Sequence, residues 1–408
     1  MKNTLIKFSL YLNYFVFAIL LNSVGIVILK MQQNFDISKS SASILEGFKD
    51  LPIAISSFVV ASFLPRLGIK KAMLIGLFLV AMICFVTTQA NDFWYFKLLF
   101  CVIGISFALI KISVFTTIGI VSKSDRDHAS TMGFLEGFFM IGVLAGNVLF
   151  SLFMDNDNPT SLNWLNVYWI LGGLSLLSFI VLYFTAIDES EIKSVKTTIK
   201  SEIGTSLNLF KNKKVIVFLF CAFFFVLVEQ SFQTWTPTFY KDVLKMSTTM
   251  SIRAGAILAF SFAIGRFLSG FISKHLKWIY VVVGCILCFS ISILIILPLV
   301  NNLSINQFTS WFNAPLVVYL FPLMGIFLSP IYPSINSVIL VSIPKYLHSS
   351  MSGLIIVFSA IGGTLGSMLT GLVFQNFSGT QAFYFSLLPL SFLLLSVIYM
   401  YSIKSNPK

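Results

Sequence analysis

Twelve apolar stretches, each about as long as a bilayer is thick, follow one another along this 408-residue chain. A helix needs ~20 mostly apolar residues to cross the hydrocarbon core, because each residue advances it by only ~1.5 Å. The sequence therefore predicts an all-α integral membrane protein with 12 transmembrane helices. We place these spans near Phe8–Leu29, Ser43–Leu64, Ala72–Thr88, Phe96–Val121, Thr131–Phe153, Trp164–Thr185, Val215–Tyr240, Ser251–Ser273, Trp278–Val300, Pro315–Val341, Met351–Phe374 and Phe383–Tyr401.

The composition excludes a soluble protein. Hydrophobic residues make up 57% of the chain and charged residues 10%, whereas soluble domains carry ~25% charged residues. Water cannot solvate that much apolar surface, so we expect the lipid bilayer as the surrounding medium. The first apolar run lacks a small-residue cleavage site of the A-x-A kind, which predicts a retained helix rather than a signal peptide.

The net charge of +12 would suit nucleic acid only if the basic residues formed one patch. They are instead scattered in short loops, so we expect no nucleic-acid partner. With both termini on the cytoplasmic side, 18 of the 27 lysines and arginines fall in cytoplasmic segments and six in external ones. This positive-inside bias predicts cytoplasmic termini. We expect the plasma membrane (the inner membrane of a bacterium) as the location.

The sequence shows no pattern that would hold a metal or cofactor. All five cysteines lie in apolar runs, and the CxxC pair Cys285 and Cys288 has no second Cys or His cluster nearby. Neither a phosphate-binding glycine loop nor an HExxH motif is present. We therefore expect no metal, no cofactor and no enzyme activity; a membrane enzyme or a transporter-like sensor is the least favoured alternative.

The chain divides into two similar halves. The longest polar stretch predicts a cytoplasmic linker at residues 187–214, between an N-terminal six-helix bundle (1–186) and a C-terminal one (215–408). At an offset of 220, His128–Leu152 overlays His348–Leu372 with nine of 25 positions identical. The pattern indicates two pseudo-symmetric bundles, and parallel repeats of this kind hold a substrate near the bilayer midplane between the halves.

A loop motif adds a family resemblance over essentially the whole chain. Between the second and third spans the sequence reads Pro65-Arg66-Leu67-Gly68-Ile69-Lys70-Lys71. Together with the six-plus-six layout and the basic linker, it resembles the loop motif of the major facilitator superfamily. The resemblance implies a twelve-helix carrier, expected to be a monomer, in which Arg66, Gly68, Lys70 and Lys71 belong to a gating loop.

A second, more limited resemblance concerns a subgroup. Asn22, the segment 31–35 and the segment 327–334 are similar to the fucose and glucose/galactose proton symporters. Lys111 stands where that group has an acidic residue. Drug antiporters of the superfamily usually have proline where this chain has Asn147.

The polar residues of the cavity-lining spans are candidates for solute binding. In the resembling family helices one, four, seven and ten line the cavity. A carboxylate, amides and an indole suit recognition of a hydroxylated solute, since polar groups bind its edge and a ring covers its apolar face. Polar packing between helices is the alternative. The candidates are Asn22, Lys111, Glu229, Gln230, Gln233, Trp235 and Tyr332.

Charges inside a span cost ~2.5–3.5 kcal/mol or more each, so they persist when they pair or function. We regard Glu136, Glu229 and Asp50 as candidates for proton coupling. Lys111 and Glu136 form either a static ion pair or a working pair in the cavity.

Two further sites of buried charge have simpler interpretations. Glu46, Lys49 and Asp50 share one helix face, which is either a hydrated helix end or, facing inward, a proton site or a latch of the outer gate. Arg266 is expected to be structural, reaching the membrane interface or a neighbouring carbonyl.

These features favour a secondary active transporter that moves a small polar solute, a sugar or similar, by alternating access and in symport with protons. The alternative is a proton-coupled antiporter that exports drugs or metabolites.

Overall fold

The computed structural model describes residues 2–121, 125–187, 189, 208–272, 276–301, 311–342 and 348–403, and every regular element in these ranges is a helix. The first half contains α1 (Lys2–Asn22), α2 (Val24–Phe35), α3 (Lys39–Ala42), α4 (Ile44–Leu67), α5 (Ile69–Thr87), α6 (Phe93–Val121), α7 (Asp125–Leu152), the 3-10 helix η1 (Asn163–Asn166) and α8 (Val167–Phe184). The second half contains α10 (Lys213–Asp242), α11 (Thr248–Ile272), α12 (Trp278–Asn301), η2 (Trp311–Asn313), α13 (Leu316–Leu323), α14 (Gly325–Leu328), α15 (Ile331–Ser342), α16 (His348–Asn376), α17 (Gly379–Tyr384) and α18 (Leu387–Ser402).

The twelve expected spans are present within the described ranges. Eleven helical segments are long and apolar enough to cross a membrane. The twelfth is α4, whose 24 residues extend ~36 Å at ~1.5 Å per residue. It carries three charged residues, Glu46, Lys49 and Asp50. Lipid offers no hydrogen bonds to a backbone, so a helix, which satisfies its own, is the form each apolar stretch takes.

Several spans consist of shorter helices. The first is longer than the sequence predicts, running from Thr4 to Phe35 with an interruption at Ser23 between α1 and α2. The tenth is divided into α13, α14 and α15. Pro237 lies inside α10 without ending it.

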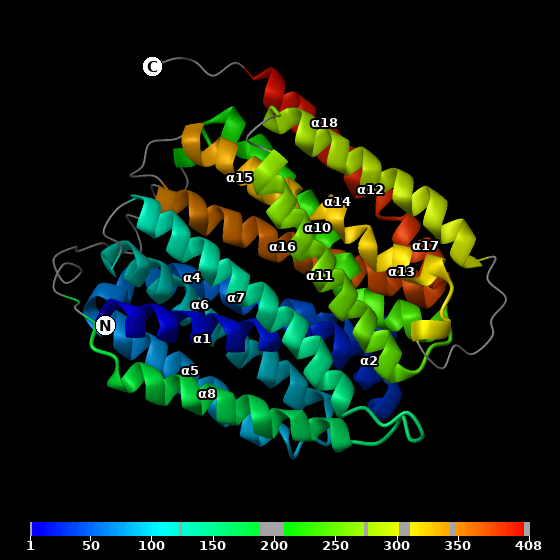
Figure 1. The fold of residues 1–408 in the computed structure, drawn as a ribbon, viewed down its shortest axis with the longest axis horizontal. Helices are drawn as coiled ribbons and strands as arrows, with labels where there is room; N and C mark the ends of the chain where they lie inside the picture. Colours follow the sequence, from blue (N-terminus) through cyan, green and yellow to red (C-terminus); the bar gives the residue numbers. More distant parts are fainter. Residues whose placement is uncertain are drawn as a thin grey trace.

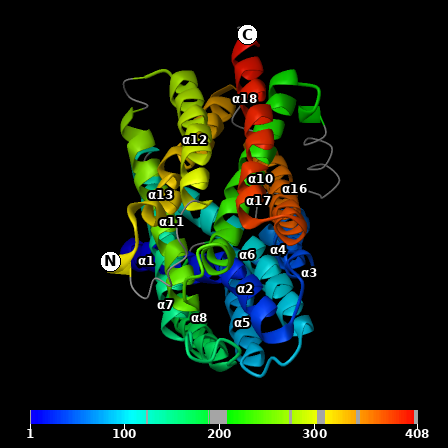
Figure 2. The same ribbon diagram turned by 90° about the vertical axis from the view of Figure 1, so that its right-hand side faces the viewer.

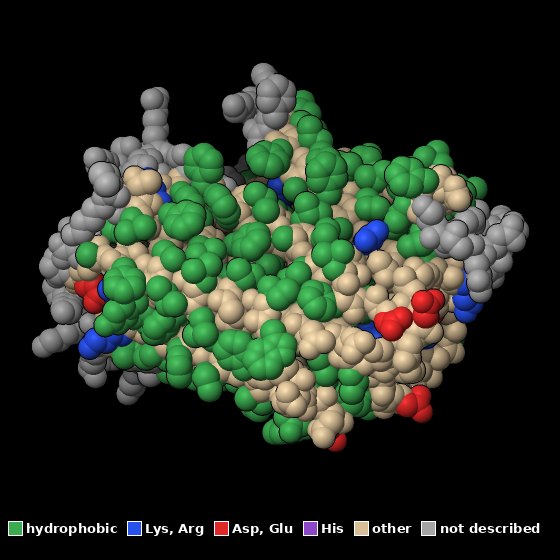
Figure 3. Space-filling view, turned by 60° about the horizontal axis from the view of Figure 1, so that its bottom comes forward, with side chains coloured by type: hydrophobic (Ala, Val, Ile, Leu, Met, Phe, Trp, Pro, Cys, Tyr) green, Lys and Arg blue, Asp and Glu red, His purple; other side chains and the backbone are tan. Residues whose placement is uncertain are grey.

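The outer surface of the molecule is apolar. Large side chains such as Phe267 (78% exposed) and Phe184 (76% exposed) project from the helices. Figure 3 shows hydrophobic side chains spread across one face, with few acidic groups and none of them in its middle. Such a surface is stable against lipid and unstable in water.

The helices form two groups that share one design. In Figures 1 and 2, α1 to α8 lie below and α10 to α18 lie above. In the first group Gly142 of α7 lies against the backbone oxygen of Phe15 on α1. In the second, Gly362 of α16 lies against the backbone oxygen of Phe223 on α10. A side chain at either glycine would hold the helices apart, so the same close packing is built twice.

Polar contacts between the two groups gather at one end of the molecule, which contains α2, α3 and the start of α11 and lies to the right in Figure 1. The Lys39 ammonium lies 2.7 Å from the Asp242 carboxylate. Further hydrogen bonds join Gln33 to Thr248, Ser40 to Gln375, Asn156 to Thr249 and Arg253 to Ser151. We call this the closed end. Toward the opposite end of α7, the Glu136 side chain is exposed.

The glycine contacts predict unequal effects of one substitution. A Cβ at position 362 would lie 2.4 Å from the Phe223 backbone oxygen, whereas one at Gly284 would meet nothing within 4 Å. We expect Gly362→Ala to destabilise the protein by about 1–3 kcal/mol, because α10 and α16 must separate. Gly284→Ala serves as the control and should be neutral or slightly stabilising. Thermal unfolding of both variants in detergent checks this, and equal melting temperatures would contradict the packing.

Candidate functional site

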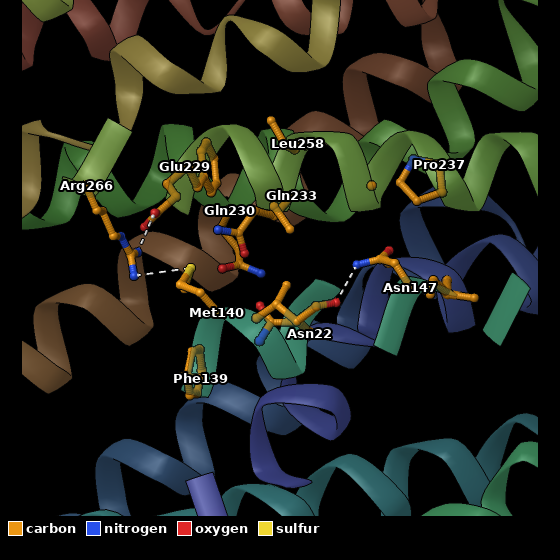
Figure 4. Close-up of a pocket in the computed structure, with 16 residues that line it drawn as sticks. Asn22, Phe139, Met140, Asn147, Glu229, Gln230, Gln233, Pro237, Leu258 and Arg266 are labelled. Carbon is orange, nitrogen blue, oxygen red and sulfur yellow. Dashed lines mark hydrogen bonds and ion pairs between the residues drawn. The ribbon is translucent and has the colours of Figure 1, made fainter. Parts of the chain in front are cut away.

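A pocket of about 190 Å³ lies between the two groups of helices (Figure 4). The first group contributes the span α1–α2 and helix α7 to the pocket walls. The second group contributes α10 and α11. The lining residues are Asn22, Gly25, Ile26, Phe139, Met140, Val143, Asn147, Glu229, Gln230, Gln233, Pro237, Gly255, Leu258, Ala259, Phe262 and Arg266. A cavity so placed changes shape whenever the two groups tilt against each other.

Four amide side chains give the pocket its hydrogen-bonding capacity. Asn22 and Asn147 each donate an amide hydrogen to a backbone oxygen of their own helix, at 2.9 and 3.0 Å, so their carbonyl oxygens remain for other donors. Gln233 has no hydrogen-bond partner within the described part of the chain. Gln230 is held by groups outside the pocket, described below. Amides both donate and accept, which suits a solute with hydroxyl or amino groups.

A charged pair forms one edge of the pocket. The Arg266 Nη2 lies 3.4 Å from the Glu229 Oε1, and its Nη1 lies 3.7 Å from the Met140 sulfur (Figure 4). The expectation that Arg266 reaches the interface or a carbonyl is therefore wrong. Its guanidinium carries five N–H donors, and one long contact to a carboxylate with one to a thioether leaves it poorly satisfied.

The other walls of the pocket are apolar. Phe139, Val143, Leu258 and Phe262 surround the polar groups. Apolar walls with a few polar groups are typical of small-molecule sites. The volume is below the 300–1,000 Å³ usual for drug-sized ligands, so the pocket in this conformation suits a small solute.

Lys111 and Glu136 lie outside this pocket, on α6 and α7. The Lys111 ammonium rests beside the rings of Phe107 and Phe115, with its nitrogen 5.8 and 6.0 Å from their centroids. In the described ranges Lys111 and Glu136 do not come within ion-pair distance of each other. The static pair is thus not formed here, and Glu136 faces open space.

Trp235 and Tyr332 are also placed away from the pocket. The Trp235 ring is fully buried, its indole N–H donates to the Ser367 backbone oxygen at 2.9 Å, and it stacks on Phe374. The expectation that this ring covers a solute is corrected, because the indole holds α10 against α16. Tyr332 stacks on Phe225 with ring centroids 5.3 Å apart.

The three charged residues of α4 are not a hydrated helix end. Glu46 is fully buried, Lys49 is 5% exposed, and the Asp50 side chain is 14% exposed. Glu46 accepts hydrogen bonds from Gln230 at 2.7 Å and from Thr234 at 3.1 Å, both on α10. The face of α4 therefore turns inward, toward the other half of the molecule.

The loop motif between α4 and α5 is closed by a residue from beyond α8. Gly68 has a φ of +89°, a conformation that glycine adopts at little cost. The Glu189 carboxylate lies beside it and accepts the Lys70 backbone N–H at 2.6 Å. A carboxylate at the start of a helix is stabilised by the helix dipole. The side chains of Arg66 and most of the expected linker (residues 190–207) fall outside the described residues.

Sequence reasoning overlooked two of the polar and charged residues that line the pocket, Arg266 and Asn147. Arg266 was expected to reach the membrane interface or a neighbouring carbonyl, because it lies close to the inner end of its span. Asn147 was noted only as a replacement for proline, although its Oδ1 lies directly against Gly255 of the other half. An amide beside the Gly142-x-x-x-Gly146 packing motif was a usable signal, since polar groups inside a span require partners.

Two six-span groups of helices with a small polar pocket between them define a carrier-type integral membrane protein. Residues 10–366 match the family model of the Major Facilitator Superfamily. The chain belongs to this superfamily. A relative described as "Protein TsgA homolog", from Buchnera aphidicola subsp. Baizongia pistaciae (strain Bp), is 20% identical over 365 residues, which covers 89% of this chain and 86% of the relative.

Solved structures of transporters share the fold. A D-xylose-proton symporter superposes with a TM-score of 0.75 at 12% identity, covering 98% of both chains. The nucleoside transporter NupG gives 0.74 at 14% identity, covering 98% of this chain and 99% of the other. A bacterial homolog of the lysosomal transporter Spinster, inward-facing and unoccupied, gives 0.72 at 15% identity, covering 98% and 95%.

The contact between Arg266 and Glu229 predicts the outcome of a double-mutant cycle on protein stability. Arg266→Gln leaves the Glu229 carboxylate without its counter-charge. The cost should be below the ~3–5 kcal/mol seen for fully buried pairs, because the Arg266 side chain is 31% exposed. Adding Glu229→Gln should recover part of the lost melting temperature. If the two effects were simply additive, the two residues would not interact.

Proposed function

We propose that this protein is a secondary active transporter that moves a small polar solute, a sugar or similar, by alternating access and in symport with protons. The observation that carries the proposal is the position of the pocket: its walls come from both halves, so any relative tilt of the halves alters access to it. Parallel repeats with a shared central site are the architecture of such carriers. Asn22, Glu229, Gln230 and Gln233, all expected to bind the solute, lie together in this pocket.

The similar solved structures and the lining of the pocket support a polar solute. Two of the similar structures are a D-xylose-proton symporter and a nucleoside transporter. The pocket of this chain offers four amides and a charged pair in a small volume, and hydroxylated solutes use such groups. Of the proton-coupling candidates, Glu229 lines the pocket, Asp50 lies in the buried α4 group, and Glu136 is exposed.

The conformation supports alternating access. An ion pair and hydrogen bonds join the halves at the closed end, while Glu136, nearer the opposite end of α7, is exposed. We propose that the closed end is the external side and that both termini are cytoplasmic, in the plasma membrane. The structure is then inward-facing, and opening the external side requires the closed-end contacts to break. The pocket fits within a single chain, and we propose a monomer.

An antiporter for drugs or metabolites is the second candidate. The apolar pocket walls and the carboxylate of Glu229, which can release a proton as a cationic compound binds, favour it. The two functions differ in phenotype. Loss of the gene should impair growth on a particular solute if the protein is a symporter, and should increase sensitivity to a toxic compound if it is an exporter.

The carboxylate in the pocket predicts a transport defect. In proteoliposomes with an inward proton gradient, we expect concentrative uptake of a sugar or nucleoside from a screened panel. Glu229→Gln should abolish accumulation while the protein stays folded, with a melting temperature that falls no further than that of Arg266→Gln, because its carboxamide keeps the shape and loses the charge that faces Arg266. Asp157→Asn, the same change in an exposed loop, is the matched control.

Wild-type accumulation by the Glu229→Gln protein would remove Glu229 from the mechanism. No uptake or exchange of any compound, under a gradient of either direction, would contradict the transporter itself.

A further inference from the structure

Three charged side chains of α4 form a buried group that the solute pocket does not include. The Lys49 ammonium contacts the Glu46 carboxylate and lies 3.5 Å from the Asp50 Oδ1. We call Glu46, Lys49 and Asp50 the α4 triad. With two carboxylates and one ammonium, the triad carries one formal negative charge in excess. Excess charge away from water is costly unless it is neutralised.

No other described charged group neutralises the α4 triad. The helices that pack against α4 are α2, α3, α5, α6, α10 and α16, and α16 contains no Asp, Glu, Lys or Arg. The charged side chains of the other helices have separate partners or lie at helix ends: Lys30 with the Pro159 oxygen, Lys39 with Asp242, Lys70 and Lys71 at the start of α5, Lys97 over Phe93, Lys111 beside Phe107, Glu229 with Arg266, and Lys213, Lys214 and Lys241 near the ends of α10.

The two carboxylates of the triad, Glu46 and Asp50, receive different numbers of hydrogen bonds and ion contacts. Glu46 accepts from Lys49, from Gln230 at 2.7 Å and from Thr234 at 3.1 Å. Asp50 has one long contact, the 3.5 Å approach of Lys49. The uncompensated charge therefore resides on Asp50, which is also the more accessible carboxylate, with 14% of its side chain exposed.

The fold itself does not require these charges. Gly47 lies against Thr364 of α16, and Gly255 lies against Asn147 of α7, so both glycines join the two halves. Gly255 follows Gly47 by 208 positions, the offset that also separates Phe15 from Phe223. In this register the triad corresponds to Ala254, Ile257 and Leu258, three apolar residues. The equivalent interface thus packs with apolar side chains at these three positions, which indicates that the charges of the triad have a function.

A hydroxyl group on α16, next to α4, has no hydrogen-bond partner among the described residues. The Thr364 hydroxyl is buried and has no partner among the described residues, while its methyl group is placed against Gly47. The preceding residue, Gly363, lies against the Asp50 carboxylate. A protonated carboxyl is a donor that needs an acceptor, and a hydroxyl oxygen provides one.

One residue belongs to both the triad and the solute pocket. Gln230 lines the pocket, and its Nε2 donates to the Glu46 carboxylate at 2.7 Å. Gln230 is on α10 and Glu46 on α4, so this bond also crosses between the halves. A solute that binds the Gln230 amide therefore changes the number of donors that Glu46 receives.

We propose that the α4 triad is the proton-binding site of the carrier, that Asp50 is the acceptor, and that Gln230 links it to the solute pocket; this rests on the proposed function. A hydronium ion transfers one proton to the Asp50 carboxylate: its O–H bond breaks, an O–H bond forms on Asp50, and a water molecule is left. The triad then becomes neutral. When a solute takes the Gln230 donor, Lys49 turns fully to Glu46, and Asp50 holds its proton more firmly. Proton and solute binding then favour each other, and this coupling is reciprocal.

Protons themselves are the probe for the test. The full-length protein in liposomes is acidified stepwise, and infrared spectra record the carbonyl band of protonated carboxyl groups. Asp50→Asn should remove one carboxyl from this band, and Asp50→Glu should retain it. Asp157→Asn is the control at an exposed carboxylate and should leave the buried band unchanged. Gln230→Leu should let the band appear at about tenfold lower proton concentration, since Glu46 loses a donor.

Two further measurements keep the test decisive. Asp50→Asn removes the excess charge, so its melting temperature at neutral pH should equal or exceed that of the wild type; a clear drop would overturn the proposal. Sodium chloride at constant pH should leave the band unchanged. If added sodium abolished the carbonyl band, the site would bind a metal cation instead of a proton.

The two proposals fail in different ways. If the Asp50→Asn protein accumulated solute and showed the same carboxyl band as the wild type, the proton site would be overturned and the proposed transport function would remain. A band lost only in Glu229→Gln would move the site to the pocket and overturn the role of Asp50. A band that depends on Asp50, in a protein that moves no solute, would support the proton site and contradict the proposed function.

Discussion

The need to satisfy polar groups away from water governs the interface between the two halves. Apolar surfaces gain nothing by leaving lipid for each other, so packing and polar contacts hold helices together in a bilayer. Here Gly25 and Gly255 allow close packing across the interface, and the polar contacts include the bonds from Gln230 and Thr234 to Glu46. The interface is therefore specific and able to open, because hydrogen bonds exchanged with water or solute cost little when they break.

Much of the fold could be read from the sequence for the same reason. Apolar stretches in lipid can only be helices or closed barrels, so their number and length fixed the architecture. The repeat around Gly142 and Gly362 is visible in the sequence alone and predicts which helices are equivalent. The orientation of single side chains could not be predicted from the sequence. Arg266 near a helix end gave no sign whether it turns outward to the interface or inward to Glu229, since that depends on helix rotation.

The candidate site was predicted in part. Asn22, Gln230 and Gln233 form part of one pocket because their helices face the centre. Trp235 follows closely in sequence, but helix rotation turns its indole to Ser367 and away from the pocket. Spacing along one helix assigns residues to a face, and only the packing of neighbours decides which face meets the cavity. The inward turn of the α4 triad was one of two interpretations left open for the same reason.

The central claim is that a pocket between two helical halves is exposed to each side of the membrane in turn. A cysteine at Gln233, in a protein otherwise without cysteine, tests it with a membrane-impermeant thiol reagent applied to either side. The account predicts labelling from both sides. A disulfide between Ser40→Cys and Gln375→Cys, across the closed end, should then block labelling from the external side alone and reversibly on reduction. Labelling from one side only, whether or not the disulfide is present, would contradict alternating access.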